Sequence, residues 1–332
     1  MRKNIFNLLY PIYARVRNFS YLFRGKPRAV GYIFMLHRVE ELSSEKLYAN
    51  ENMNISPQYL DNFLNQIEKK YDIIRLEEVP SRLRSQNLRK FAVFTMDDGY
   101  KDNLYNALPI FKKHNVPYTI FVTTNFPDKK AILWWYIVED LILGNEEIRL
   151  SNGVCLNART KEEKEECFIA LRREILKLDQ QNLLAELLKL FSFYSIDWYS
   201  KCDTLCLNWD EIKILKNEPL VTLGAHTKNH YNLKQLPHEN NVAEEVLSGY
   251  ERLKEMADIE STIFAYPFGS FNEASEREFS VLSGLKDKFI LSVRAMGGPV
   301  SQGDSDMYSL PRIMIEEEKS FRNLTLVKGV RV

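Results

Sequence analysis

Two patterns of apolar residues alternate along most of the chain. Short runs rich in β-branched and aromatic residues predict strands buried on both faces, and stretches with apolar residues at helical spacing follow most of them. Strands that alternate with helices favour a parallel sheet, because parallel neighbours need a crossover connection. The predicted strands lie within residues 29–39, 72–76, 90–96, 116–124, 220–226, 261–269, 286–294 and 307–315.

The alternation stops between residues 126 and 204, where the sequence predicts helices and no clear strand. We therefore expect an α/β domain in two parts, 29–125 and 205–318, with a helical insertion at 126–204 and a C-terminal tail at 319–332. Seven or eight strands suit a TIM-like barrel. Trp134 and Trp135, in the insertion, are interpreted either as packing anchors or as stacking surfaces for a sugar ring.

Two of the predicted helices have recognisable beginnings. Ser56 is a typical N-cap residue and Pro57 suits the first helical position, so a helix is expected to begin there. The stretch 272–285 predicts a second helix, capped by Asn272.

Composition narrows the class of protein. The chain has 332 residues, of which 45% are apolar and 27% charged, as is typical of a soluble globular protein. Its formal net charge is zero, so no basic field indicates a nucleic-acid partner. No run of about 18 apolar residues predicts a membrane-spanning helix.

The segment 1–28 differs from the rest because it combines large apolar residues with seven Lys or Arg and no acid. It is interpreted either as an amphipathic helix on an anionic membrane surface or as a helix packed on the domain. It lacks the continuous apolar core and the cleavage site of a secretory signal. We therefore expect a cytoplasmic location, with peripheral association at the inner face of the membrane as a further hypothesis.

The four cysteines fall in one region of the chain. Cys202 and Cys206 have a spacing that zinc sites use, but no histidine or second cysteine pair lies close by in the sequence. Reduced thiols are therefore the favoured interpretation.

Chemically reactive side chains follow two of the predicted strands. Asp97 and Asp98 come directly after the strand at 90–96, and His226 and His230 follow the strand at 220–226. In a parallel barrel, the carboxyl ends of the strands meet on one face. Two histidines and one aspartate suit a divalent metal with an open position, and the second aspartate is then free to act as a base. The sequence thus predicts a hydrolytic metal site.

The motifs "TMDDGY", "HTKNH" and "AYPFG" occur in the order found in polysaccharide deacetylases of carbohydrate esterase family four, the proteins with a NodB homology domain. The segments "MLHRV", "NWDEIKIL" and "YSLPRI" are similar to that family too, so the resemblance covers about residues 31–125 and 205–315. It implies a distorted (β/α) barrel that holds a divalent metal and removes acetyl groups from N-acetylated sugars.

The resemblance also implies a role for each of four residues. Asp97 matches the general base, and Asp98, His226 and His230 match the metal ligands. One divalent ion is expected, with zinc first and cobalt, nickel or manganese as alternatives. In the family, the ion polarises the amide carbonyl and activates a water, whose proton Asp97 would take.

Further matches concern the substrate. The backbone N–H of Phe268 corresponds to a group that holds the oxyanion in the family. Tyr100 is expected to line the site, and Tyr266, in the same motif as Phe268, is also expected close to the substrate.

The sequence departs from the family at the arginine that orients the base, because Ala265 stands where the third motif usually begins with Arg. Arg38, Arg294 and Arg312 are the candidates to replace it. Arg312 is included among the expected site residues.

A second departure concerns the general acid, because no histidine lies after His238, whereas many family members carry a late Leu-x-His motif. His37 follows the first predicted strand and is expected on the same face as Asp97 and Asp98. We interpret it as the proton donor for the leaving amine. The alternative is that His37 caps the strand or bonds a backbone carbonyl.

Taken together, these observations predict a metal-dependent hydrolase that removes acetyl groups from the N-acetylated sugars of a polysaccharide or glycan intermediate. Two alternatives stay open. One is a non-catalytic glycan-binding barrel of the same family, and the other is a different metal-dependent hydrolase, such as a phosphoesterase.

Overall fold

The computed structural model describes residues 29–85, 89–295, 297–302 and 306–317. The segment at 1–28 and the tail at 319–332 lie outside these residues, and so does the hypothesis of membrane association. Among the described helices, none combines the length and the apolar character that crossing a membrane requires.

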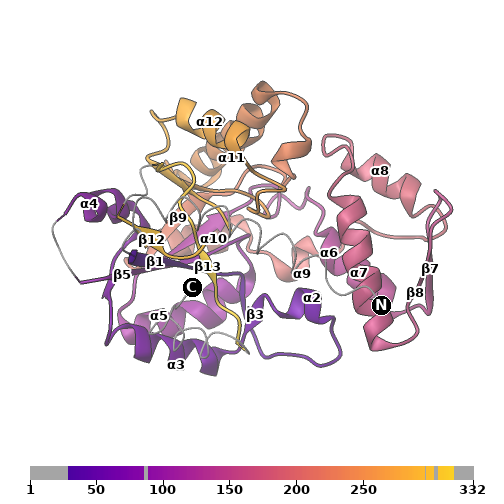
Figure 1. Ribbon diagram of the computed structural model, residues 1–332, viewed down its shortest axis with the longest axis horizontal. Coiled ribbons are helices and arrows are strands. Elements are labelled where there is room, and N and C mark those ends of the chain that lie inside the picture. The colour runs from indigo at the N-terminus through magenta and orange to yellow at the C-terminus, as the bar shows by residue number, and fades with distance from the viewer. Residues whose placement is uncertain (1–28, 86–88, 296, 303–305, 318–332) are drawn as a thin grey trace, which may run out of the picture.

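Seven parallel strands of the described chain form a curled, irregular barrel, which confirms the predicted fold (Figure 1). The segment that contains β13 closes it, because Ile313 pairs with Phe34 of β1 and Leu310 forms a bridge to Val293 of β11. The strands follow the order β11 (Leu291–Val293), β10 (Ile263–Ala265), β9 (Val221–Ala225), β6 (Tyr118–Val122), β5 (Phe91–Met96), β1 (Ala29–Leu36) and β13 (Ile313–Met314).

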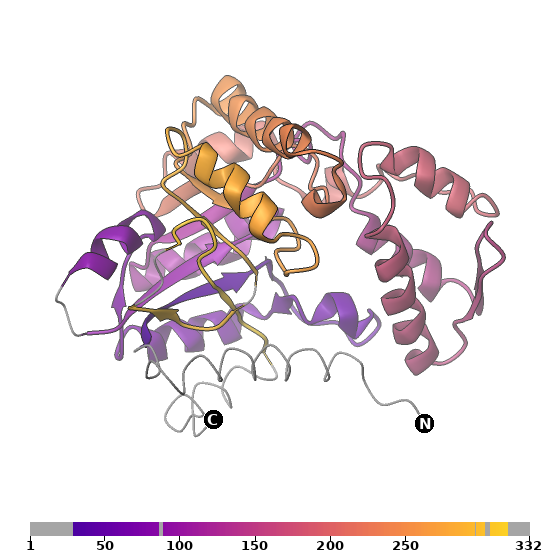
Figure 2. The ribbon, with the colours of Figure 1, turned by 45° about the horizontal axis from the view of Figure 1, so that its top comes forward.

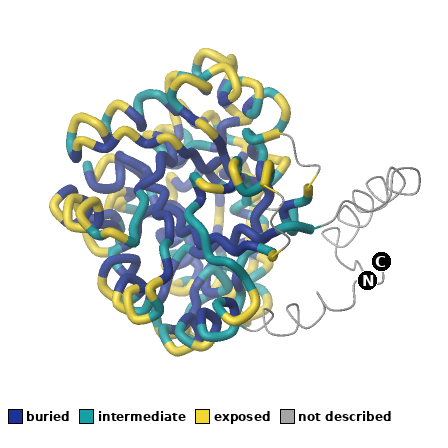
Figure 3. The backbone as a smooth tube through the Cα atoms, turned by 90° about the vertical axis from the view of Figure 1, so that its left-hand side faces the viewer, coloured by how far each residue is buried: buried dark blue, intermediate teal, exposed yellow. Residues whose placement is uncertain are grey.

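Strand β5 illustrates why the strands appear in the sequence as continuous apolar runs, since all six of its residues are buried. Phe91 and Val93 belong to the cluster of strand residues that includes Phe121. Phe94 belongs instead to the cluster with Phe63 of α3 (Pro57–Ile67). Both faces of the strand are therefore packed, and Figure 3 shows buried strands inside a layer with exposed outer positions.

Helices link the strands and cover the barrel. The helix at α3 begins as predicted, with Pro57 in its first turn and the Ser56 side chain accepting from the Tyr59 N–H. The other helices of the barrel part are α2 (Tyr48–Glu51), α4 (Val79–Arg84), α5 (Leu108–His114), α9 (Cys202–Leu205), α10 (Trp209–Lys216), α11 (Glu239–Ala257) and α12 (Glu276–Gly284).

Short elements complete the barrel part. Strand β12 (Val300–Ser301) runs antiparallel to β1, β4 (Asp72–Ile73) runs parallel to β5, and β2 (Arg38–Val39) pairs with β3 (Asn54–Ile55). Single turns of 3₁₀-helix occur at Leu76–Glu78 and Leu233–Gln235, and a π-helical turn at Asn103–Ala107 leads into α5.

The prediction that Asn272 caps a helix is wrong. Helix α12 begins after Ser275, which forms a capping box with Glu278. The backbone N–H of Asn272 instead bonds the side chain of Ser270, within the turn that follows β10. Two candidate capping residues lie three positions apart here, and only Ser275 has the glutamate that completes the box.

The insertion forms a lobe beside the barrel, as Figures 1 and 2 show. It contains α6 (Trp134–Leu143), α7 (Lys161–Ile175) and α8 (Leu183–Leu190) around its own apolar cluster. The prediction that it lacks strands is wrong, because β7 (Glu147–Arg149) and β8 (Cys155–Asn157) form an antiparallel hairpin. Only Ile148 of these six residues is buried, so no apolar run marks the two strands in the sequence.

The lobe also holds the loop that follows β2. The buried Glu139 of α6 accepts from the Leu47 N–H at 2.8 Å, and Glu165 of α7 accepts from the N–H groups of Tyr48 and Ala49 at 2.5 and 3.1 Å. The insertion is therefore tied to the barrel through carboxylates bonded to backbone groups.

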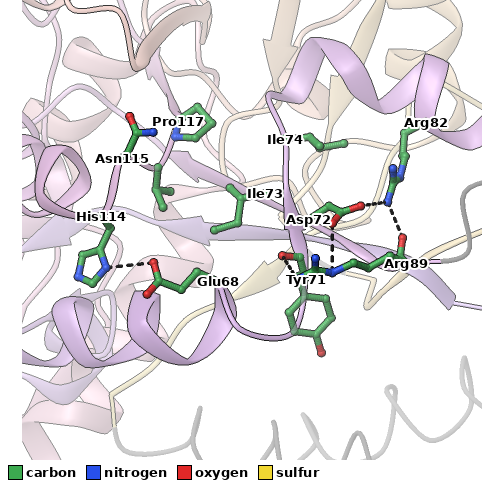
Figure 4. Close-up of a pocket in the computed structure, with 11 residues that line it drawn as sticks. Glu68, Tyr71, Asp72, Ile73, Ile74, Arg82, Arg89, His114, Asn115 and Pro117 are labelled. Atoms are coloured by element: carbon green, nitrogen blue, oxygen red, sulfur yellow. Dashed lines mark hydrogen bonds and ion pairs between the residues drawn. The ribbon is translucent and has the colours of Figure 1, made fainter.

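A cavity of about 550 Å³ lies where β4, β5 and β6 begin (Figure 4). Its charged side chains neutralise one another: Asp72 pairs with Arg82 and Arg89, and His114 bonds Glu68. Catalytic groups of parallel barrels gather at the opposite ends of the strands, so this cavity is not the candidate active site.

Candidate active site

The two aspartates sit on a strained turn directly after β5. Asp98 has φ of 76° and Gly99 has φ of 80°, in the left-handed region that residues other than glycine seldom adopt. Such a conformation costs on the order of 1–3 kcal/mol and is found mostly at functional sites. Asp97 and Asp98 are both buried. The turn sends their carboxylates to different partners, Arg312 and the two histidines.

Asp98, His226 and His230 converge as predicted. The Oδ1 atom of Asp98 lies 3.4 Å from Nε2 of His226 and 3.1 Å from Nε2 of His230. The possible ligand atoms of these three buried residues all lie within 4.8 Å of one another. Within the described residues, Asp98 Oδ1 has no hydrogen bond of acceptable geometry. A buried carboxylate oxygen without a donor, facing two imidazole nitrogens, fits a divalent cation.

The protonation states of the ligands suit a metal. His226 Nδ1 lies 2.7 Å from the Ala265 carbonyl oxygen, so Nδ1–H donates there and Nε2 carries the lone pair. Burial lowers the pKa of His230, although the charge of Asp98 acts in the opposite direction. Burial raises the pKa of Asp98, but His230 and His226 outweigh it and hold that pKa well below its usual value.

The histidine loop is held by helix α11. Thr227 and His230 have φ of 66° and 60°, and the His230 N–H donates to Thr227 Oγ1 at 3.0 Å. The Glu245 carboxylate accepts from the backbone and side-chain amides of Asn229 at 2.6 and 2.7 Å. Gly249 has no side chain where the loop passes: a Cβ there would lie 2.5 Å from the carbonyl carbon of Thr227.

Asp97 forms a fork-shaped ion pair with Arg312. Nη1 and Nη2 of the arginine lie 2.7 and 2.6 Å from the two carboxylate oxygens, and Arg312 is 1% exposed. Its remaining bonds go to Thr95 Oγ1 and to the carbonyl of Arg294. Burial raises the pKa of Asp97, but the charge of Arg312 outweighs it, so the pKa is lowered overall.

Of the three candidate arginines, Arg312 is therefore the one that meets the carboxylate. Arg38 bonds Asp102 and Glu40, and Arg294 donates to the Ser309 carbonyl.

His37 lies beside the same carboxylate. Its Nε2 is 4.0 Å from Asp97 Oδ2, and 14% of its side chain is exposed. Within the described residues its Nδ1 has no hydrogen-bond partner, so the imidazole does not bond a backbone carbonyl. The geometry places a partly accessible imidazole next to Asp97, on the face where the sequence expects it.

Phe268 is the middle residue of a tight turn in which the Gly269 N–H bonds the Pro267 carbonyl at 2.6 Å. Its φ is 58°, another left-handed conformation. The backbone N–H of Phe268 donates to no acceptor within the described residues. Its ring centroid lies 4.6 Å from that of His230. A free backbone N–H on a residue whose ring packs against the candidate ligand His230 is a suitable donor for an oxyanion.

The two tyrosines are enclosed. Tyr266 is 0% exposed, and its hydroxyl donates to the Tyr308 carbonyl at 2.8 Å, so the expected substrate contact is not supported by its position. Tyr100 is 1% exposed beneath Arg38, 5.1 Å from its guanidinium, and its hydroxyl accepts from Trp135 Nε1. Tyr100 packs in the cluster that includes Phe126 beside the site, whereas Tyr266 packs in the main core of the barrel.

Aromatic residues that the motifs do not include surround His230. The rings of Phe126 and Trp135 lie 5.9 and 5.2 Å from its imidazole. Trp134 is buried in the core of the lobe, whereas Trp135 is half-buried. The paired tryptophans are a visible signal in the sequence, but only the fold shows which of them borders the site.

The cysteine pair takes no part in this cluster. Cys202 and Cys206 are buried free thiols, and Cys202 Sγ lies 3.1 Å from the Ala131 carbonyl. Within the described residues, Asp98, His226 and His230 form the group with metal-ligand spacing.

Comparison with known structures supports the fold. The deacetylase PplD from Streptococcus pyogenes, solved in complex with acetate, aligns with a TM-score of 0.59 and 19% identity over 90% of this chain and 98% of that one. IcaB from Ammonifex degensii aligns with a TM-score of 0.55 and 18% identity over 88% and 94%. At these identities, the likeness establishes the fold alone.

Comparison of sequences identifies the family. No curated protein matches the chain. A family described as polysaccharide deacetylase matches residues 84–282, more than half of the chain, and this span includes both aspartates, both histidines and Phe268. The chain therefore belongs to the polysaccharide deacetylase family and is a carbohydrate deacetylase.

Proposed function

We propose that the protein is a metal-dependent hydrolase that removes acetyl groups from the N-acetylated sugars of a polysaccharide or glycan intermediate. One observation carries the proposal: the Asp98, His226 and His230 ligand set lies beside Asp97, which is oriented by two bonds from Arg312. The family match supports the same reaction.

Asp98, His226 and His230 would hold one divalent ion, with zinc as the first expectation because this set is typical of catalytic zinc sites. When bound, such an ion supplies Lewis-acid activation of water and of the acetyl carbonyl. The lone pair of His226 Nε2 is presented to the site because Nδ1–H bonds Ala265.

Asp97 is the group positioned to accept the proton of the attacking water. Its lowered pKa keeps the carboxylate ionised, and the fork of Arg312 fixes its orientation. As the water oxygen bonds the carbonyl carbon, the carbonyl oxygen gains negative charge. The Phe268 N–H would donate to this oxygen.

His37 would then protonate the sugar nitrogen as the C–N bond breaks, which releases acetate and a free amine. His37 is the histidine of the site that is not a proposed metal ligand. The distance of 4.0 Å between its Nε2 and Asp97 Oδ2 supports the role.

The alternative of a non-catalytic glycan-binding barrel was favoured by the absent third-motif arginine and late histidine. Arg312 and His37 lie beside Asp97 and supply equivalent groups, which supports catalysis instead.

The test is acetate release from a panel of N-acetylated glycans. Metal-free protein and protein reconstituted with zinc, cobalt, nickel or manganese are compared, and we expect acetate only after reconstitution. Stoichiometric metal binding with no acetate released from any N-acetylated glycan would favour the alternative of a non-catalytic glycan-binding barrel. Phosphate release from phosphoesters would favour the phosphoesterase.

A further inference from the structure

Arg172, on helix α7 of the insertion, is a half-buried charge that has no hydrogen-bond or ion-pair partner among the described residues. Its guanidinium lies 5.9 Å from the centre of the Phe268 ring. Within the described residues it forms no hydrogen bond or ion pair, although the charge of Glu273 acts on it from a distance. Glu273 itself accepts from the Ser270 hydroxyl. Burial lowers the pKa of Arg172, but an arginine remains charged at neutral pH.

This lack of a partner sets Arg172 apart from other arginines. Burial of a charge is costly unless hydrogen bonds or an opposite charge compensate. The other described arginines that are buried or half-buried all have such compensation: Arg38 from Asp102, Arg75 from the Pro219 carbonyl, Arg82 from Asp72, Arg252 from Asp128, Arg277 from Glu278, Arg294 from the Ser309 carbonyl and Arg312 from Asp97. The remaining described arginines are exposed to solvent: Arg84, Arg89, Arg149, Arg159 and Arg173.

The position of Arg172 relates it to the active site. The Phe268 ring beneath it contacts the imidazole of His230, with centroids 4.6 Å apart. On the same ring, Trp135 packs edge-on at 6.2 Å and remains half-buried. The insertion thus contributes a cation that is one ring away from the ligand set and an aromatic surface that contacts His230 itself, with ring centroids 5.2 Å apart.

We propose that Arg172 and Trp135 form a subsite for a sugar that carries an anionic group, a phosphate ester or a carboxylate, next to the acetylated sugar. A guanidinium bonds two oxygens of either anion at once, and an aromatic ring packs on the apolar face of a sugar. This inference rests on the proposed function, because it names the substrate class for that site.

The test compares three glycans that share one acetylated sugar and differ in the neighbouring group: neutral, phosphate-bearing and carboxylate-bearing. For the native enzyme, we expect kcat/KM to be about 10- to 100-fold higher for an anionic glycan than for the neutral one, as a charge-assisted hydrogen bond allows. Arg172→Gln should remove this preference, so that the ratio of kcat/KM between an anionic and the neutral glycan falls to about 1, while Arg172→Lys should retain part of the preference.

Arg173→Gln is the matched control, because the neighbouring arginine on α7 is exposed and lies in no described contact. It should keep the full preference. Trp135→Ala should lower kcat/KM for all three glycans by the same factor, since stacking on the sugar does not depend on the neighbouring charge. A preference for phosphate alone identifies a phosphate ester, and equal preferences indicate that either anion is accepted. Equal kcat/KM for all three glycans in the native enzyme overturns the proposal.

Calorimetric binding of the same glycans to metal-free protein separates this inference from the proposed function. Tighter binding of an anionic glycan that Arg172→Gln abolishes supports the subsite even if no acetate is released. Binding that is indifferent to Arg172, in an enzyme that does release acetate, rejects the subsite alone.

Discussion

At the scale of single residues, the proposed metal ligands and the proposed base have different partners, because Asp97 bonds Arg312 and Asp98 faces the histidines. His226→Ala or His230→Ala should therefore lower bound metal sharply, whereas Asp97→Asn should keep it and lose turnover. Elemental analysis and acetate release measure the two effects. Full metal occupancy in both histidine variants, or native rates in Asp97→Asn, would contradict this division.

The ion pair of Arg312 and Asp97 is buried, so removal of one partner leaves the other charge buried without compensation. Arg312→Met should lower the free energy of unfolding by about 3–5 kcal/mol and abolish turnover. The double variant Arg312→Met, Asp97→Asn should recover much of the stability and none of the activity. Denaturant unfolding of all four proteins gives the coupling between the two sites. Strictly additive losses would show that the pair is not coupled.

His37 is proposed as the proton donor. His37→Ala should bind metal and substrate normally, while kcat falls by roughly 100-fold or more, because the amine leaves poorly without a proton. His114→Ala serves as a control, since His114 bonds Asp61 and Glu68 on the far end of the barrel. Near-native kcat in a metal-loaded His37→Ala enzyme would exclude the role.

The sequence predicted Asp97, Asp98, His226 and His230 as one cluster, because each pair directly follows a buried strand and parallel strands bring such ends together. It did not select Arg312 from three arginines. That ion pair joins residues 215 positions apart, and no local pattern reveals which arginine reaches across the barrel. Tyr266 was expected near the substrate on motif position alone, which does not show which way a side chain packs.

At the scale of elements, helix α11 packs against the loop that contains His230 and bonds it through Glu245. Gly249→Ala should displace the Thr227 backbone, lower stability by about 1–3 kcal/mol and weaken metal binding, because its Cβ would meet main-chain atoms that cannot move aside cheaply. This expected loss of stability is opposite in sign to the gain that Gly→Ala usually gives inside a helix.

Gly284→Ala in α12 is the control, since its Cβ would have open space around it. Thermal unfolding and metal titration of the two variants provide the comparison. If Gly249→Ala is as stable as Gly284→Ala and binds metal as tightly, the loop does not depend on this close approach.

The elements were predictable where a buried apolar run or a helical period marks them, even in three-residue strands such as β10 and β11. Barrel strands and most helices follow from periodicity, and the insertion follows from the point where the alternation stops. The β7–β8 hairpin was missed because its strands are mostly exposed and form no apolar run, unlike the equally short β10 and β11. The start of α12 was misplaced because Asn272 and Ser275 are both typical caps. Short elements depend on tertiary contacts that no window of sequence contains.

At the scale of the whole molecule, the basic segment 1–28 lies outside the described residues, and its proposed role rests on sequence. Each Lys or Arg near an anionic surface contributes on the order of 1 kcal/mol, so several give weak, salt-sensitive binding. A chain that starts near Lys26 should fold but lose sedimentation with anionic vesicles. Equal sedimentation of the full and shortened chains would reject membrane association.

The segment that closes the barrel also has a consequence for biosynthesis. Arg312 belongs to that segment, so the counter-charge of Asp97 emerges from the ribosome after all three proposed metal ligands. Contacts between residues so distant in the chain form late, because loop closure precedes them. A nascent chain that already has Asp98, His226 and His230 would still lack an oriented base. We therefore expect deacetylation only once the barrel is complete, because the proposed base is not oriented before Arg312 reaches it.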